Sequence, residues 1–245
     1  MLEARALVKS FGALRASDGI DFDVREGETH AVIGPNGAGK TTFISQLAGN
    51  LRPDAGRIVF AGEDITALPA PRRARKGLAR SFQITSIYQD FTVLENVALA
   101  VQAQAGHSFR FWRRAFDDAS LVHPAKRILD EVGLGARAGV PAANLSHGEQ
   151  RQLEVAMALA TRPRLLLLDE PMAGMGAEES QRMIGFLAAL KKRHSIILVE
   201  HDMDAVFRLA DRISVLVYGR LIATDVPEKI KMNEEVRRAY LGEDA

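Results

Sequence analysis

Short apolar runs alternate with segments of helical spacing along most of this chain. Apolar runs rich in Val, Ile and Leu predict β-strands at 28–33, 57–60, 165–168, 196–200 and 213–217. Apolar residues that recur every three or four positions predict helices at about 40–49, 149–161, 178–191 and 204–210. The run at 165–168 consists of consecutive leucines, which is typical of a central strand covered on both faces. This alternation predicts an α/β fold with a mostly parallel sheet.

The strand pattern fades between about residues 83 and 145, where apolar residues recur at helical spacing over 93–103 and 121–132. A mostly helical subdomain is therefore expected within the α/β core. With 245 residues, of which 47% are apolar, the chain is long enough for one large domain with a substantial core. We place a single domain at 1–245, with the core at about 1–83 and 163–245 and the helical subdomain at about 84–162.

Composition narrows the class of protein. Lys and Arg number 32 against 31 Asp and Glu, so the net charge gives no general attraction to nucleic acid, and no nucleic-acid partner is expected. The chain has no cysteine, which excludes disulfides and thiolate metal sites and is compatible with a reducing cytoplasm. No apolar run approaches the roughly 18–20 residues needed to cross a bilayer, and the first residues lack the pattern of a secretory signal. These features predict a soluble, intracellular protein.

A glycine-rich segment lies between the strand predicted at 28–33 and the helix that follows it. It matches G-x-x-x-x-G-K-[ST] at every fixed position and comprises Gly34, Pro35, Asn36, Gly37, Ala38, Gly39, Lys40 and Thr41. Small residues let successive backbone N–H groups point at one anion, and the helix adds the positive end of its dipole. Lys40 can reach the terminal phosphates, and the Thr41 hydroxyl can hold Mg²⁺. Together with Thr42, the segment predicts a site for a nucleoside triphosphate; a chance glycine-rich turn would lack this strand–loop–helix context.

Polar residues at three other element ends point to the same chemistry. Asp169 and Glu170 follow the leucine run, where Asp169 is expected to support Mg²⁺ and Glu170 to polarise the attacking water. By themselves, two acidic residues after a strand usually mark only a strand end exposed to solvent. Ser146 and Gly148 precede a helix and form a second candidate anion cradle, although Ser146 alone would be an ordinary N-cap. His201 follows the strand at 196–200, from which its side chain can reach a γ-phosphate.

Together these residues resemble the ATP-binding cassette family, and the resemblance covers nearly the whole chain. The usual signature of the family is Leu-Ser-Gly-Gly-Gln, whereas residues 145–150 read LSHGEQ, with His147 and Glu149 as departures. The resemblance implies that Ser146, His147, Gly148 and Glu149 face the ATP of a partner subunit. It also implies a P-loop NTPase (RecA-like) core, an N-terminal antiparallel β region and an inserted α-helical subdomain.

The resemblance implies roles for two further residues and does not explain the sequence of one loop. Gln83 lies at the Q-loop position, which implies contact with Mg²⁺ and the attacking water. Phe11 lies where the family places an aromatic ring on adenine, and its alternative is an ordinary core Phe. The loop after Glu170 usually ends in Leu-Asp, but residues 171–176 read PMAGMG, so how two active sites would communicate stays open. We expect ATP and Mg²⁺ as cofactors, with catalytic residues Glu170, His201 and Gln83 and metal-site residues Thr41, Gln83 and Asp169.

Members of the family pack two cassettes head to tail, and this chain carries one phosphate-binding loop, which implies pairing with itself or with a related cassette. Residues 77–83, 199–203 and 239–243 resemble the larger ATPase subunit of branched-chain amino acid importers, whose relatives take in urea, amides or aromatic acids. The implied partners are a second ATPase subunit, transmembrane permeases and, indirectly, a periplasmic solute-binding protein. The implied location is the cytoplasmic face of the inner membrane, with residues 83–88 as the main permease contact.

Three other functions stay open. The ATPase of lipopolysaccharide export ends in a similar Tyr-Leu-Gly-Glu, although residues 199–203 favour the importer. A soluble cassette protein of translation or DNA repair usually carries two cassettes or long coiled coils, and a small-molecule P-loop kinase has no use for the cradle at Ser146 and Gly148. Two segments are also ambiguous: the basic run at 72–76 is a solvated helix face or a lipid or permease contact, and 109–114 is an interface or a local core.

Overall fold

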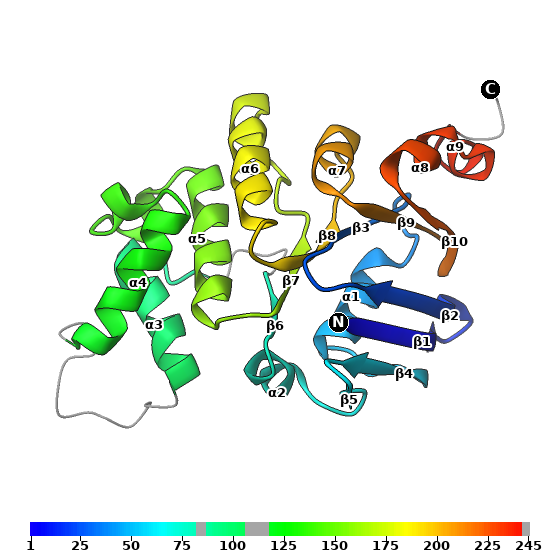
Figure 1. The fold of residues 1–245 in the computed structure, drawn as a ribbon, viewed down its shortest axis with the longest axis horizontal. Helices are drawn as coiled ribbons and strands as arrows, with labels where there is room; N and C mark the ends of the chain where they lie inside the picture. The colour runs from blue at the N-terminus through cyan, green and yellow to red at the C-terminus, as the bar shows by residue number, and fades with distance from the viewer. Residues whose placement is uncertain (82–86, 106–117, 242–245) are drawn as a thin grey trace.

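The computed structural model describes residues 1–81, 87–105 and 118–241. Within these ranges, six strands form a sheet in the order β10-β9-β3-β8-β7-β6 (Figure 1). Neighbouring strands are parallel except β9 and β10, so the predicted α/β fold with a mostly parallel sheet is confirmed. The strands are β3 (Thr29–Ile33), β6 (Leu78–Arg80), β7 (Leu165–Asp169), β8 (Ser195–Val199), β9 (Arg212–Val217) and β10 (Arg220–Asp225).

A second sheet is antiparallel, and its described strands follow the order β2-β1-β4-β5. The strand predicted at 57–60 lies in this sheet and not in the parallel one. The N-terminal antiparallel region implied by the family resemblance is thereby confirmed. Its strands are β1 (Leu2–Phe11), β2 (Leu14–Val24), β4 (Ala55–Phe60) and β5 (Glu63–Asp64).

The helices fall into groups around the sheets. Helices α3, α4 and α5 pack on one another at one end of the molecule, beyond β6, while α1 lies near the antiparallel sheet (Figure 1). Within the described residues, 93–160 therefore form a helical region, although the subdomain boundaries stay a prediction. The helices are α1 (Lys40–Ala48), α2 (Ala70–Arg75), α3 (Val93–Ala105), α4 (Ala119–Glu131), α5 (His147–Ala160), α6 (Ala177–Leu190), α7 (Met203–Leu209), α8 (Pro227–Met232) and α9 (Glu234–Leu241), with short 3₁₀ turns at Gly135–Arg137 and Ala142–Asn144.

Both faces of the parallel sheet are covered by apolar side chains. In β7, Leu166 and Leu168 belong to a buried cluster that includes residues of α3 to α7. Leu165 and Leu167 belong to a second cluster with α1 and the antiparallel sheet. Successive side chains of a strand point to opposite faces, so a strand buried on both sides needs an unbroken apolar run.

The basic run at 72–76 is not a uniform solvated helix face. Arg73 is only 1% exposed and donates hydrogen bonds, within 3.0 Å, to the backbone carbonyls of Gln46, Leu47, Thr66 and Leu68. Burial lowers the pKa of Arg73 to about 10, which leaves the guanidinium charged at neutral pH. The cation lies at the C-terminal end of α1, where the helix dipole favours positive charge. For Arg73 the expectation of a solvated residue is therefore wrong, because the end of α1 supplies acceptors that the sequence of α2 does not reveal.

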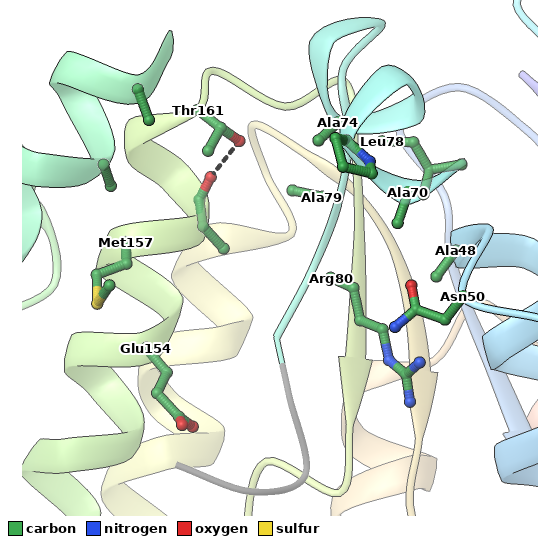
Figure 2. A pocket seen from close by; sticks show the side chains of 14 residues that line it. Ala48, Asn50, Ala70, Ala74, Leu78, Ala79, Arg80, Glu154, Met157 and Thr161 are labelled. Atoms are coloured by element: carbon green, nitrogen blue, oxygen red, sulfur yellow. Dashed lines mark hydrogen bonds between the residues drawn. The ribbon is translucent and has the colours of Figure 1, made fainter. Parts of the chain in front are cut away.

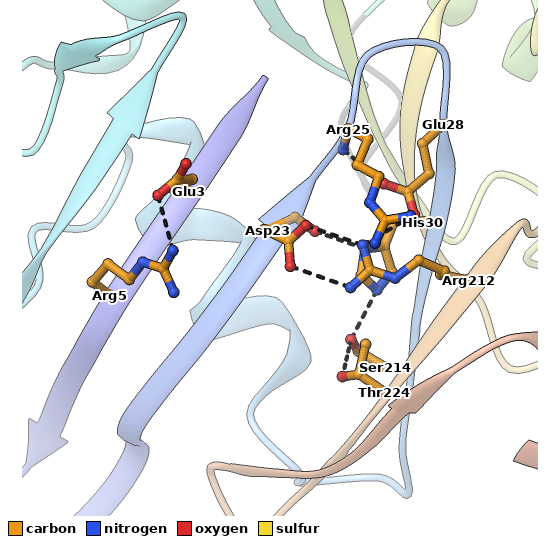
Figure 3. A network of polar contacts seen from close by, with 9 residues as sticks. All are labelled: Glu3, Arg5, Asp23, Arg25, Glu28, His30, Arg212, Ser214 and Thr224. Carbon is orange, nitrogen blue, oxygen red and sulfur yellow. Dashed lines mark hydrogen bonds and ion pairs between the residues drawn. The ribbon is translucent and has the colours of Figure 1, made fainter.

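A buried histidine joins β2, β3, β9 and β10 (Figure 3). His30 Nδ1 lies 2.8 Å from the backbone oxygen of Asp23, and Nε2 lies 2.8 Å from Ser214 Oγ, which is 2.7 Å from Thr224 Oγ1. Because a carbonyl only accepts, Nδ1 donates to Asp23 and Nε2 accepts from Ser214, as in a neutral imidazole. Arg212 Nη1 lies 3.0 Å from a carboxylate oxygen of Asp23 and adds positive charge beside the ring.

The network around His30 predicts that stability falls in mild acid. Burial lowers the pKa of His30 from its ordinary 6.5 to about 4. Between these pH values the unfolded chain binds a proton that the folded chain does not, so the free energy of unfolding should decrease by about 3 kcal/mol as pH falls from 6.5 to 4. Urea unfolding of the wild type and of His30→Gln, followed across this range, isolates the contribution. Equal pH slopes in the two proteins would show that His30 does not carry it.

Candidate functional site

The glycine-rich loop connects β3 to α1, as the sequence predicts, and two of its glycines have no room for a side chain. A Cβ atom at Gly34 would lie 2.1 Å from the backbone oxygen of Leu216. At Gly39, which precedes α1 with φ +103°, it would lie 2.3 Å from the backbone oxygen of Ala16. The loop therefore needs glycine at both positions to follow its path beside β2 and β9.

Lys40 begins α1 and folds back over the loop. Its ammonium donates hydrogen bonds to the backbone oxygens of Gly34 and Pro35, at 2.7 and 3.1 Å. Burial lowers the pKa of Lys40, and the nearby carboxylates of Glu170 and Asp169 oppose that effect. A cation held inside the curve of the loop, close to two carboxylates, is suited to bind the phosphates of a nucleotide. The neighbouring Thr41 is exposed in the first turn of α1.

Three predicted site segments lie at one edge of the parallel sheet. Strands β3, β8 and β7 are adjacent and parallel, and their carboxyl ends lead into the glycine-rich loop, His201 and Asp169-Glu170, respectively. Ligands of open α/β sheets bind outside such strand ends. The fold therefore brings these predicted residues to one edge.

Asp169 and Glu170 differ in their surroundings. Asp169 is 2% exposed, and its Oδ2 lies 2.7 Å from Nη2 of Arg80 in the adjacent strand β6. Glu170 has φ +49°, a left-handed conformation that is uncommon for a residue with a side chain, and its N–H donates to the Val199 oxygen of β8. Sequence reasoning missed Arg80, because its partner Asp169 lies 89 positions away along the chain.

Glu200, which sequence reasoning also missed, connects two loops of the site. Its buried carboxylate accepts hydrogen bonds from the backbone N–H of Met172 (2.9 Å) and of His201 (3.0 Å). Burial raises the pKa of Glu200, while these donors act in the opposite direction. The side chain of His201 is 64% exposed, with Nδ1 3.7 Å from Glu200 Oε2. Glu200 thus links the loop after Glu170 to the loop that contains His201 through hydrogen bonds.

The second candidate cradle lies at the start of α5. Ser146 is the N-cap, and Glu149 completes a capping box: Glu149 N–H donates to Ser146 Oγ (3.3 Å), and Ser146 N–H donates to Glu149 Oε2 (2.9 Å). Glu149, a departure from the usual signature, therefore has a structural use in this chain. A Cβ atom at Gly148 would lie 3.3 Å from a carboxylate oxygen of Glu179 in α6. In Figure 1, β6 and β7 lie between α5, which begins after Ser146, and α1, which follows the glycine-rich loop.

The other departure, His147, lies beside the loop that follows Glu170. Its Nε2 would be 3.4 Å from a Cβ atom at Gly174, which has φ +78°. We expect His147→Gly to keep ATPase activity within a few-fold of wild type, a change of less than roughly 1 kcal/mol in the barrier, because the ring faces Gly174. Steady-state hydrolysis measures this, with Ser146→Ala as the contrasting variant that removes a hydroxyl of the cradle. A hundredfold loss in His147→Gly would contradict it.

The remaining predicted residues lie elsewhere. Phe11 ends β1 and is 50% exposed, so the alternative of an ordinary core Phe is wrong, while its stacking on adenine stays a prediction. Gln83 and the segment 109–114 lie outside the described residues. Of the predicted permease contact at 83–88, Ile87 packs against the core, and Tyr88 is exposed and stacks on Phe91, with 5.5 Å between ring centroids.

Comparison with known proteins identifies the family of this chain. Residues 17–173 match the ABC transporter family, and residues 220–245 match the family described as branched-chain amino acid ATP-binding cassette transporter. The branched-chain amino acid transport ATP-binding protein BraF of Pseudomonas aeruginosa is 38% identical over 99% of this chain and 98% of its own length. LivG of Escherichia coli, which carries the same description, is 36% identical, and the lipopolysaccharide export ATP-binding protein LptB of Haemophilus influenzae is 32% identical, both with 99% of this chain and 98% of the relative covered.

Solved structures show the same architecture. A nucleotide-free ATP-binding cassette from an ABC transporter aligns with a TM-score of 0.87 and 27% identity, covering 99% of both chains. A cassette in its ADP conformation aligns with a TM-score of 0.87 and 29% identity, again over 99% of both chains. With a family match over most of the chain and relatives similar along nearly its whole length, this protein belongs to the ATP-binding cassette family of ABC transporters.

Proposed function

We propose that this chain is the ATP-hydrolysing subunit of an importer for branched-chain amino acids or related hydrophobic, small polar or aromatic solutes. The observation that carries the proposal is the match of residues 220–245 to the branched-chain transporter family, together with 36–38% identity to BraF and LivG. The lipopolysaccharide-export relative is less similar, at 32%, which favours the importer. Family membership makes the P-loop kinase alternative wrong and disfavours a soluble, non-transport cassette.

Within this proposal, each residue at the sheet edge has one task. The amides of the glycine-rich loop and Lys40 bind the phosphates, Glu170 accepts a proton from the attacking water, and His201 contacts the γ-phosphate. Phe11 stacks on adenine, and Gln83 contributes to the position of the water. The assignments of Lys40, Glu170 and His201 rest on the shared sheet edge and on the charges around Lys40, whereas those of Phe11 and Gln83 rest on the family resemblance alone.

The donors available fit Mg²⁺ bound mainly through the nucleotide. Thr41 offers a hydroxyl and Asp169 a carboxylate, and no group of three or more His, Cys, Asp or Glu side chains in the described ranges is arranged to hold a metal ion. Mg²⁺ at phosphate sites typically uses one or two protein oxygens and completes its shell with phosphates and water. When bound, Mg²⁺ would neutralise charge that develops on the phosphates.

The position of Ser146 and Gly148 supports a paired arrangement. Strands β6 and β7 lie between α5, which begins after Ser146, and α1, which begins at Lys40 (Figure 1). We therefore propose that Ser146 and Gly148 complete the ATP site of a second cassette, in a two-fold pair with an identical or related subunit. Closure of such a pair around ATP and its opening after hydrolysis would supply the movement that the permeases use.

An apolar cleft of about 400 Å³ supports a permease-docking site (Figure 2). One wall comes from α1, α2 and β6, and the other from α3 and α5. Small side chains let a helix approach closely, and the lining includes Ala48, Ala70, Ala74, Ala100, Ala103 and Ala158. We propose that a short permease helix fits here, next to β6, and that the helical subdomain at about 84–162 forms the wall that moves.

Among the described residues, no helix is long and apolar enough to cross a membrane. On the basis of the importer relatives, we propose a location at the cytoplasmic face of the inner membrane, where the permeases would hold the chain and link it indirectly to a periplasmic solute-binding protein.

Photo-crosslinking in membranes tests the docking site. A crosslinker on Ala103→Cys, in the cleft, should capture membrane proteins, and one on Met232→Cys, exposed on α8, serves as the matched control. Transport of radiolabelled leucine into cells that lack this protein should recover with the wild type and not with Lys40→Ala. Capture only from position 232 would contradict the docking site, and unchanged leucine uptake in the deletion strain would contradict the substrate class.

A further inference from the structure

The side chain of Arg80 reaches from the apolar cleft to the nucleotide site. Arg80 ends β6 and is one of the residues that line the cleft (Figure 2). At the far end of the same side chain, Nη2 lies 2.7 Å from Oδ2 of Asp169, and Nη1 lies 3.2 Å from Oγ of Ser45 in α1. One residue therefore contacts the proposed docking site, the helix that follows the phosphate loop, and the carboxylate assigned to Mg²⁺.

This ion pair is nearly closed to solvent. The side chains of Arg80 and Asp169 are 10% and 1% exposed. A buried pair is screened little, and loss of one partner leaves the other charge uncompensated, so the orientation of each group depends on the other. Arg80 Nε is also buried and has no hydrogen-bond partner in the part of the chain that the structure describes. The guanidinium is thus held by Asp169, by Ser45 and by the packing of its own methylene stem.

We propose that Arg80 is a positioning residue that couples occupancy of the cleft to Asp169, and through Asp169 to Mg²⁺-dependent nucleotide binding. The proposal rests on the proposed function of the cleft and of Asp169. A permease segment that packs against the stem of Arg80 restricts where its guanidinium lies, and the ion pair passes this restriction to the carboxylate. Asp169 accepts a hydrogen bond from Arg80 through Oδ2, and its other carboxylate oxygen would be available to support Mg²⁺. Because coupling between binding sites is reciprocal, bound Mg²⁺-nucleotide must change the cleft in turn.

Calorimetric titration of the full chain with ADP, in Mg²⁺ and in EDTA, tests the half of the proposal that concerns Asp169. Arg80→Met keeps an apolar stem and removes the guanidinium, Arg80→Gln replaces it with a neutral polar group, and Arg75→Met on the exposed side of α2 is the matched control. Mg²⁺ should increase the affinity for ADP roughly 10-fold less in both Arg80 variants than in the wild type. This is the size of effect seen when a residue that orients a metal-site group is lost. In Arg75→Met the effect of Mg²⁺ should be unchanged. In EDTA, the affinity of the Arg80 variants for ADP should stay within about twofold of the wild-type value, because Lys40 and the loop amides are intact.

A merely structural ion pair would give a different result. In that case the Arg80 variants would be less stable but would keep the full Mg²⁺ gain, which would overturn the proposal. If Arg80→Met does not fold, Arg80→Gln is judged by the same criterion. Wild-type protein that fails to bind ADP at all would instead contradict the proposed function, so the two failures are distinguishable.

The absence of cysteine allows the cleft to be filled at a single position. Ala103→Cys places one thiol in the cleft, and reaction with N-benzylmaleimide adds apolar bulk there. We expect this modification to change the affinity for Mg²⁺-ADP roughly fivefold when Arg80 is present and to have no effect in the Arg80→Gln background. The same modification of Met232→Cys should have no effect in either background. Equal changes with and without Arg80, or no change with it, would overturn the coupling.

Discussion

Replacement of Glu170 with Gln should slow ATP hydrolysis by roughly 10²–10⁴-fold, the usual contribution of a general base. Glutamine keeps the shape of the side chain but cannot take a proton from water. The backbone of Glu170 is fixed by its hydrogen bond to Val199, so the substitution should leave the geometry of the loop in place. ATP binding should survive, because it depends on Lys40 and the loop amides.

Phosphate release and nucleotide binding, measured on the same preparation, separate these two effects. Glu178→Gln is a matched control, because Glu178 is an exposed carboxylate on α6 in an ion pair with Arg182 and should be close to neutral. Hydrolysis by Glu170→Gln at the wild-type rate would show that another group acts as the base.

Ser146→Arg should abolish ATP-dependent dimerisation of the Glu170→Gln protein. With hydrolysis blocked, each ATP is expected to join Lys40 of one chain to Ser146 of the other, so closed dimers should accumulate in ATP and Mg²⁺. An arginine at position 146 removes the hydroxyl and fills the space that the second chain needs. Size-exclusion chromatography with saturating ATP measures the shift, on the chain alone and with the cassette that co-purifies with it.

Because Ser146 also caps α5, the loss of a helix cap must be separated from the loss of a phosphate contact. Ser146→Asp keeps a good N-cap but places negative charge beside the phosphate, so it should stay monomeric while remaining as stable as the parent protein. Ser146→Thr keeps both the hydroxyl and the cap and should still dimerise. If Glu170→Gln itself stays monomeric with its partner and saturating ATP, the proposed pairing is refuted.

The parts of the fold that the sequence predicted well are those where one physical requirement acts over a short range. The leucine run of β7 needs to be apolar on both faces, and the path of the phosphate loop needs glycine at Gly34 and Gly39. The pattern of apolar and polar residues along the chain did not predict strands β1 and β10. In β1, irregular register and a left-handed residue at Ala6 interrupt the alternation. The edge strand β10 has few buried positions, so its sequence carries little apolar signal.

The residues of the site also differ in how well the sequence predicts them. Asp169 and Glu170 were predictable because they follow a strong strand, and the glycine-rich loop because its spacing is set by the phosphates it must surround. Arg80 and Glu200 were not, because their roles depend on which strands become neighbours. Arg80 meets Asp169 across 89 positions of sequence, and Glu200 meets the N–H of Met172 across 28. No local pattern encodes such a distance, and only the order β8-β7-β6 brings these groups together.

The acceptors that surround the buried guanidinium of Arg73 are all backbone oxygens in the described structure. The residues that supply these oxygens need no particular side chain for the contact, whereas Gly49 must stay small, because a Cβ atom there would lie 2.7 Å from Nε of Arg73. Covariation between positions would give no sign of the contact, because a carbonyl oxygen is present whichever residue carries it. Among the four basic residues of the run at 72–76, which look interchangeable in sequence, tolerance to substitution should therefore be concentrated at three and absent at Arg73.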